Sequence, residues 1–327
     1  EIEAKELETY KEMSPFRLVL RRFFRSKLSI VGLVMIVFLF AFSFLGPVIY
    51  TRWGETEPDR RPITVKDEIV VSYEDEQGNK IEATQIIFIN KETRAYQGIS
   101  LDHLLGTDDQ GLDIFVRLMY GGRISLAIGL LSTLISTVIA VLFGAVSGCA
   151  PAWLDALLMR LTEIFLSVPN LLLVIFLLAA AGKSNVITIS AVIGMTSWTS
   201  IAKVVRTEVR QIRNSEYVIA SRCMGGSFFY ILWHHLAPNF FSSIMFMVVM
   251  NIRSAIVAES TLSFMGIGLP LEVISWGSML SLSEKALMTK AWWIILIPGV
   301  FLIVTLLSFT SIGNYLRKQA NRKQRNL

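Results

Sequence analysis

The residues best suited to chemistry lie inside apolar sequence. Arg253 and Glu259 occur in the stretch "MNIRSAIVAESTLSF", together with Asn251 and several serines. A charged side chain at the centre of a membrane span costs about 2.5–3.5 kcal/mol or more, so such residues face a cavity or a partner. On a straight helix Arg253 and Glu259 project roughly 240° apart and do not pair. We predict that these three residues line a pathway on which Arg253 attracts a carboxylate of a passing solute; alternatively, Arg253 pairs with a carboxylate of a second subunit.

Two other patterns resemble cofactor sites but fail on spacing. His234 and His235 are adjacent, so on a helix they point about 100° apart and do not readily share a metal. The stretch "GKS" at 182–184 ends like a phosphate-binding loop, yet Leu177 stands where that pattern needs glycine. The sequence holds no HExxH, GxSxG or clustered metal ligands. We therefore expect a chain that is not an enzyme and that itself binds neither metal nor cofactor.

The composition is that of a membrane protein rather than a soluble domain. Of the 327 residues, 53% are hydrophobic and 17% are charged. Long apolar runs with few charges indicate membrane spans. The net charge is +5, but the basic residues cluster at the ends of apolar runs, which argues against nucleic acid as a partner. Cys149 and Cys223 form neither a CxxC pair nor a zinc spacing, so we expect reduced structural thiols.

Several apolar segments are long enough to cross a bilayer. A hydrocarbon core of about 30 Å requires about 20 apolar residues in a helix. We therefore predict an all-α membrane protein with six transmembrane helices, the first of which is too long to be a cleaved signal. The predicted spans cover residues 28–50, 123–149, 155–181, 186–206, 240–268 and 292–313.

The short loops concentrate basic residues on one side of the membrane. An excess of Lys and Arg marks the cytosolic side. Basic residues precede the first span, occur in the loop after the fourth span, and dominate the tail 317–327. With six spans these segments share one side. Both termini and the loop 207–239 are therefore predicted to be cytosolic.

Two segments outside the spans carry patterns of their own. In 1–27, Ser14 and Pro15 suit a helix start, and apolar residues share one side while arginines supply charge. This predicts an amphipathic helix at the cytosolic lipid surface, with a plain basic flank as the alternative. Residues 51–122 are predicted to face outside. Within them "ITVKDEIVVSYEDEQGNKIEATQIIFINKE" alternates apolar and polar residues around a turn, which predicts a small β-hairpin.

A patterned segment lies in the loop between the fourth and fifth spans. Residues 216–224 suit one helix, and the pair Gly225-Gly226 breaks it. Ser227 then suits the cap of a second helix, "FFYILWHHLA", from which Pro238 leads into the fifth span. A helix–glycine–helix finger of this kind suits a groove on a soluble partner. The alternative is a loop that only connects two spans.

The same segment resembles the "EAA" loop of ABC importer permeases. Four other stretches, "LLGTDDQGLDIFVRLMYGGRISL", "LLMRLTEIFLSVPNLLL", "AESTLSFMGIGL" and "SWGSML", are similar to the same family in the same order. Over residues 104–316 the chain is identified as a C-type permease subunit of the dipeptide/oligopeptide ABC importer family. Within the loop the shared residues are Ala220, Met224-Gly225, Ile231-Leu232 and Pro238-Asn239.

The resemblance implies the type I ABC importer architecture, with 123–316 as the permease core and 207–239 as its coupling loop. The chain would form half of a peptide pathway in the inner membrane, as a heterodimer with a second permease. The implied partners are two cytosolic ATPase subunits that hold Mg-ATP and an extracytoplasmic peptide-binding protein. A same-family permease for nickel or a metal chelate is the nearest alternative, followed by an ion channel or secondary transporter. The resemblance assigns ATPase coupling to Glu216, Ala220, Ser221, Arg222, Gly225 and Pro238.

Three positions depart from the family's pattern. Ile219 stands where the loop usually has Glu, Ser221 replaces its second Ala, and Leu112 replaces the usual Arg. Ile219 cannot make a charge contact that the usual Glu makes. The glycine break and the helix pattern remain, so docking remains the prediction.

Overall fold

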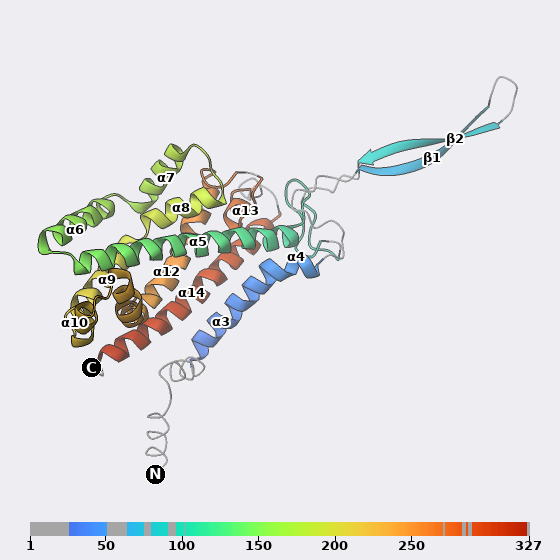
Figure 1. Ribbon diagram of the computed structural model, residues 1–327. Coiled ribbons are helices and arrows are strands. Elements are labelled where there is room, and N and C mark those ends of the chain that lie inside the picture. The colour runs from blue at the N-terminus through green and yellow to red at the C-terminus, as the bar shows by residue number, and fades with distance from the viewer. Residues whose placement is uncertain are drawn as a thin grey trace, which may run out of the picture.

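Helices make up most of the computed structural model of the chain, which Figure 1 shows. The predicted amphipathic segment 1–27 lies outside the described residues apart from its last two. The structure describes residues 26–50, 64–74, 80–90, 96–101, 103–270, 272–282, 286 and 290–325.

The helical elements follow one another with short connections at most junctions. The first three, α3, η1 and α4, form one uninterrupted helical segment. The elements are α3 (Lys27–Phe40), η1 (Ala41–Leu45), α4 (Gly46–Ile49), α5 (Ile114–Cys149), α6 (Ala152–Ser167), α7 (Asn170–Ala181), α8 (Val186–Thr196), α9 (Thr199–Ile212), α10 (Glu216–Cys223), α11 (Phe228–Ile231), η3 (Leu232–Leu236), α12 (Ala237–Phe264), α13 (Trp276–Leu282) and α14 (Trp293–Arg325).

A two-stranded antiparallel hairpin lies between α4 and α5 in the chain. Strand β1 (Thr64–Glu74) pairs with β2 (Lys80–Asn90) along their whole lengths. Figure 1 shows the hairpin projecting from the side of the molecule where α4 lies. The predicted β-hairpin is confirmed, because a side-chain period of two is that of a strand and the turn sequence falls between the two strands.

The predicted first, second, fifth and sixth spans are confirmed as long apolar helices. α5 begins at Ile114 rather than at residue 123, so the segment predicted to lie outside as 51–122 already includes the first turns of this helix. Asp113 sets that start, because its carboxylate accepts hydrogen bonds from the N–H groups of Phe115 (2.8 Å) and Val116 (3.3 Å). Among the described residues, the helices long and apolar enough to span a membrane are Lys27–Ile49, Ile114–Cys149, Ser243–Phe264 and Trp293–Gln319.

The predicted third and fourth spans are each a bent pair of helices. α6 and α7 bend by 91°, and α8 and α9 bend by 48°. In the first pair Val168 is extended (φ −95°, ψ 132°), because Pro169 disfavours the helical conformation in the residue before it. In the second pair the hydroxyls of Thr196 and Ser197 both donate to the carbonyl of Ile193, at 3.0 and 2.8 Å, and such bonds compete with the helical ladder. The described chain has up to six spans when each bent pair counts as one.

The helices are arranged around α5, which is about 54 Å long at 1.5 Å per residue. α9, α8 and α12 pack along it, and α14 packs against both α12 and α3. Figure 1 shows α5 running between two sides of the molecule. We call the side with α10, the start of α6 and the end of α5 the α10 end. The side with α13, α4 and the start of α5 is the α13 end.

α5 and α9 cross at close range at the α10 end. A Cβ atom built on Gly144 would lie 2.6 Å from the carbonyl oxygen of Ala202, and one on Gly148 would lie 2.7 Å from Cγ1 of Val209. Any side chain at these positions would push the helices apart, whereas glycines let the two backbones approach closely. The predicted second span and the second half of the predicted fourth span therefore form one tightly packed unit.

Candidate functional site

The predicted finger folds as a helix followed by a glycine turn. α10 ends in a Schellman motif: the N–H of Gly225 donates to the carbonyl of Arg222 (3.0 Å), and that of Gly226 donates to the carbonyl of Ser221 (2.9 Å). Gly225 has a φ of +83°, in the left-handed region that favours glycine. A Cβ at Gly225 would meet nothing within 4 Å, so backbone conformation alone requires this glycine. The predicted glycine break is confirmed.

The second helix of the finger continues into the fifth span. Ser227 caps α11 as predicted, since its hydroxyl accepts from the N–H of Tyr230 (3.3 Å). α11, η3 and α12 then follow without interruption, so the second helix runs through Pro238 directly into the fifth span. Pro238 lies in the first turn of α12 and has no N–H to donate. The turn before it widens into the π-helix η3, which accommodates the proline.

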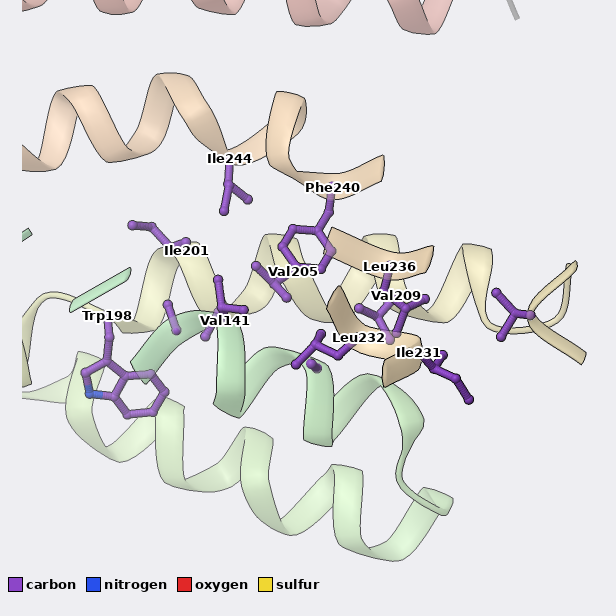
Figure 2. Packing of buried hydrophobic residues seen from close by; sticks show 14 residues of the cluster. Val141, Trp198, Ile201, Val205, Val209, Ile231, Leu232, Leu236, Phe240 and Ile244 are labelled. Atoms are coloured by element: carbon purple, nitrogen blue, oxygen red, sulfur yellow. The ribbon is translucent and has the colours of Figure 1, made fainter. Parts of the chain in front are cut away.

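The inner face of the finger is part of the hydrophobic core at the α10 end. Val218 of α10 is fully buried, as are Leu232 and Leu236 of η3. Figure 2 shows Leu236 of η3 beside Val209 of α9 and Phe240 of α12 beside Val205 of α9, all in one cluster. The finger is therefore seated on α9 and the end of α5, so that a force applied to α10 reaches the spans through packed side chains.

The outer face of the finger is apolar and exposed. Met224 is 82% exposed, and Phe229 and Trp233 are each 60% exposed. An apolar surface of this kind marks an interaction site. The exposure of these side chains was not predicted, although so many aromatic and long apolar side chains in a predicted cytosolic loop are a usable signal. The exposed residues are Tyr217, Ile219, Met224, Phe228, Phe229, Tyr230 and Trp233.

The residues predicted to couple to an ATPase differ in how exposed they are to solvent. Ser221 is buried, and its hydroxyl lies close under Gly226, so it supports the turn from inside. The side chain of Pro238 is outside the described part of the structure. The predicted residues at the surface are Glu216, Ala220, Arg222 and Gly225.

The α10 end contains a charged cluster that was not predicted from the sequence. The carboxylate of Asp155 accepts from Nε and Nη2 of Arg206, both at 2.5 Å, and from Nη1 of Arg210 at 3.0 Å. The hydroxyl of Ser147 also donates to it, at 2.6 Å. The Asp155 side chain is only 7% exposed. Arg206 and Arg210 are 51 and 55 positions away in the chain, so no local spacing reveals this cluster.

The three predicted pathway residues point to different neighbours. Nδ2 of Asn251 donates to the hydroxyl of Ser136 on α5 (2.9 Å). Nη1 of Arg253 lies 3.5 Å from the hydroxyl of Thr310 on α14, and its buried Nε has no partner among the described residues. As predicted, Arg253 and Glu259 are not paired. The structure therefore does not gather these side chains into a single site.

Glu259 lies inside the subunit and is fully buried. Its carboxyl group accepts hydrogen bonds from the hydroxyls of Ser263 (2.9 Å), Ser125 (3.1 Å) and Ser260 (3.3 Å). These partners join α12 to α5. Ser125 also accepts from the N–H of Trp276 (3.2 Å), which ties the start of α13 to the same group.

The stretch "GTDDQGLD" forms an ordered loop before α5. Oδ1 of Asp108 accepts from the N–H groups of Gln110 (2.9 Å) and Leu112 (2.8 Å). Its Oδ2 lies 2.8 Å from Nη1 of Arg117, and both side chains are almost fully buried. Leu112, which stands in place of the family's usual Arg, contributes to this loop through its backbone.

Residues 114–323 match the family described as the binding-protein-dependent transport system inner membrane component. The chain belongs to this family. Residues 14–61 also match the N-terminal transmembrane domain of oligopeptide transport permease C. Family membership and the helical structure confirm the predicted fold class, an all-α membrane protein with the architecture of an importer permease and a small β-containing insertion.

Relatives align with this permease chain over most of its length. The dipeptide transport system permease protein DppC of Bacillus subtilis is 31% identical over 309 residues, which is 93% of this chain and 85% of that protein. The oligopeptide transport system permease protein OppC of the same organism is 31% identical over 315 residues, 96% of this chain and 92% of that protein. OppC of Haemophilus influenzae is 32% identical over 305 residues, 93% and 88% of the two chains.

A solved structure is also similar to this permease. The MetNI methionine ABC transporter in inward-facing conformations matches 64% of this chain and 95% of that chain, with 15% identity and a TM-score of 0.46. Within the described part of this permease, no group of three or more His, Cys, Asp or Glu residues is placed to hold a metal ion.

Proposed function

We propose that this chain is the C-type permease subunit of an ATP-driven peptide importer. It forms half of the translocation pathway and is not itself an enzyme. The observation that carries the proposal is the exposed apolar face of α10 and α11, held on a glycine turn in a member of this transport family. Relatives that align along nearly the whole chain are named dipeptide and oligopeptide permeases, which supports peptides as the cargo.

The α10 end faces the cytosol of the cell, across the inner membrane from the β1–β2 hairpin. The apolar face of α10 and α11 docks on the cytosolic ATPase pair, which holds Mg-ATP. A second, different permease completes the pathway, and an extracytoplasmic binding protein delivers the peptide to it. This orientation is supported by the basic residues of the loop and tail, which belong on the cytosolic side, and by Figure 1, where α10 and the end of α14 lie on the same side of the molecule.

Movement of the ATPases becomes movement of the spans through packing. Val218, Leu232 and Leu236 seat α10 and η3 on α9 and α5, so a displacement of α10 displaces these helices rather than bending a free loop. Packed interfaces switch between discrete arrangements instead of deforming continuously. The pathway accordingly alternates between outward-open and inward-open states.

Of the predicted pathway residues, Arg253 is the one we assign to the cargo. Its guanidinium has one long hydrogen bond and a buried Nε without a partner among the described residues. A positive charge held in this way attracts the carboxylate of a passing peptide. Asn251 and Glu259 are engaged with hydroxyls of α5 inside the subunit.

Docking is tested by Gly225→Val. Gly182 provides a matched control, because it also has a positive φ (+67°) with nothing within 4 Å of a built Cβ, but lies at the end of α7. A side chain in the left-handed region costs about 1–2 kcal/mol at either site. Gly225→Val should weaken co-purification of the ATPase subunits and reduce peptide uptake, while Gly182→Val should affect neither. Equal ATPase retention by both variants would sink the docking proposal, and nickel uptake without peptide uptake would sink the assignment of cargo.

Orientation is tested with single cysteines in a background without Cys149 and Cys223. Gln77→Cys lies between β1 and β2 in the chain, and Asn214→Cys lies just before α10. An impermeant thiol reagent added to whole cells should label the first and not the second. The reverse labelling would overturn the proposed orientation.

A further inference from the structure

We propose that Asp155 is the positioning residue that makes α10 move together with α5 and α6. The proposal rests on the ATPase docking described above. It assigns a role in transmission to the cluster of Asp155, Arg206 and Arg210, in which the carboxylate is buried while the Arg210 side chain is 45% exposed. None of the three residues belongs to the docking face of α10 and α11.

The cluster joins three helices at one point. Ser147 is in the last turn of α5, Asp155 is in the first turn of α6, and the two arginines are one turn apart on α9. Arg206 engages both carboxylate oxygens through Nε and Nη2, which fixes direction as well as distance. The carboxylate also suits its place, because the start of a helix carries a partial positive charge. The corner between α5 and α6 is thereby fastened to α9.

Two further arginines, one after α9 and one on α10, contact the end of α5. Arg213 follows the end of α9, and its Nη1 donates to the carbonyl of Gly148 at the end of α5 (2.9 Å). On α10 itself, Nη2 of Arg222 lies 3.9 Å from Sγ of Cys149, the last residue of α5. With the close crossing at Gly144 and Gly148, these contacts prevent α9 from sliding along α5.

The other side of α10 is built differently. There the chain turns through Gly225, which has a positive φ and open space around it. α10 therefore follows α9 through the short connection that contains Arg213, shares the core of the α10 end with α9 through Val218, and is joined to α11 by a glycine turn. A displacement of α10 passes first to α9, and from α9 through Asp155 to the corner of α5 and α6.

α6 is suited to receive this movement. It ends where Pro169 breaks the chain into the 91° bend before α7, so a shift at its Asp155 end swings a short helix about that bend. Removing the Asp155 carboxylate leaves Arg206 and Arg210 as like charges one turn apart, without the group that binds them to α6. We expect α9 and α6 then to move independently.

The experiment uses the complete transporter in proteoliposomes, with Asp155→Asn and a matched control, Arg160→Gln. Arg160 also forms an ion pair on α6, with Glu163 at 2.7 Å, but its side chain is 79% exposed. ATPase retention, ATP hydrolysis and import of a labelled peptide are measured together. Asp155→Asn should retain the ATPases and hydrolyse ATP, while the number of ATP molecules hydrolysed per peptide imported rises about tenfold. Arg160→Gln should leave that ratio unchanged.

A second variant separates positioning from simple stability. Arg206→Lys keeps the charge but loses the planar fork, and it should raise the ratio by less than Asp155→Asn does. The positioning role is overturned if ATP hydrolysis and peptide import fall in proportion in Asp155→Asn. If Asp155→Asn fails to insert into the membrane, Arg206→Lys decides: an unchanged number of ATP molecules hydrolysed per peptide imported then overturns the positioning role. Loss of docking is recognised separately, because it would appear as a wild-type chain that does not retain the ATPases.

Discussion

Asp155 and Glu259 are two buried carboxyl groups at two helix junctions, and they are held in opposite ways. Asp155 joins α6 to α9 and α5 through two guanidinium groups and one hydroxyl. Glu259 joins α12 to α5 through serine hydroxyls, with no cation among its described partners. Asp155 is slightly accessible at 7%, whereas Glu259 is fully buried.

The difference reflects what each junction has to do. Long arginine side chains reach across gaps and hold helices that approach from different directions, while hydroxyls require the helices to lie almost in contact. The α12–α13 junction meets that requirement: a Cβ on Gly277 would lie 2.5 Å from Cα of Ser260, and the indole N–H of Trp276 donates to the carbonyl of Leu118 (3.0 Å). The junction at Asp155 transmits force by charge, and the junction at Glu259 is held by close packing.

The largest effect should come from breaking the packing at Gly277. Gly277→Ala places its Cβ against the backbone of Ser260, which can be relieved only by moving α13 away from α12. We expect a loss of about 3 kcal/mol or more, because overpacking of a close backbone contact is costly. Thermal unfolding of the detergent-solubilised complex measures it. Gly299→Ala is the control, since a Cβ built on Gly299 would lie 3.9 Å from Cδ2 of the flexible Leu280 side chain, which is an ordinary contact. Equal unfolding temperatures would show that α13 is loosely held.

The hydrogen bonds between Glu259 and the surrounding serine hydroxyls are tested by Glu259→Leu. The variant introduces an apolar side chain of similar size and leaves Ser125 and Ser263 without their acceptor. A buried donor left unsatisfied costs about 1–3 kcal/mol, so the complex should unfold at lower temperature. Glu259→Gln retains one acceptor oxygen and should lose less. If Glu259→Leu is as stable as the wild type but fails to import peptide, Glu259 belongs to the pathway rather than to the packing.

Arg253 lies on α12, like Glu259. Among the described residues its charge is held neither by an ion pair, as at Asp155, nor by a set of serine hydroxyls, as at Glu259. Arg253→Gln should leave the complex assembled and lower peptide uptake about fivefold, which corresponds to the loss of about 1 kcal/mol from a charge-assisted contact. Uptake and co-purification of the second permease are measured side by side. Weakened co-purification would instead place the partner of Arg253 on the second permease, and no change in either would mean that Arg253 reaches water or headgroups.

The smallest effect should follow from removing the hairpin, which belongs to neither junction. Deleting residues 64–94 and bridging the ends with glycines should leave membrane insertion unchanged and reduce import less than the substitutions above. Import should fall because the deletion removes a surface that contacts the binding protein or the partner permease. Import at the wild-type rate would make the hairpin dispensable.

Local patterns were sufficient for the elements that depend on neighbours in the chain. The hairpin followed from alternation about a turn, the break at Gly225 from a glycine pair, and the cap at Ser227 from a residue type suited to a helix start. The spans followed from the length of apolar runs, which does not reveal the bend at Pro169. The effect of proline on its predecessor could have predicted this bend.

The sequence by itself determined membership of the family, the helical class, the hairpin and the turn of the finger, because each depends on residue types at short, regular spacing. Only the tertiary structure decided that Asp155 meets Arg206, that Glu259 meets Ser125 inside the subunit, and that Gly144 and Gly148 mark a helix crossing. Such contacts join residues tens to more than a hundred positions apart. Which face of a helix meets which neighbour depends on the packing of all the helices together, and no local spacing encodes it.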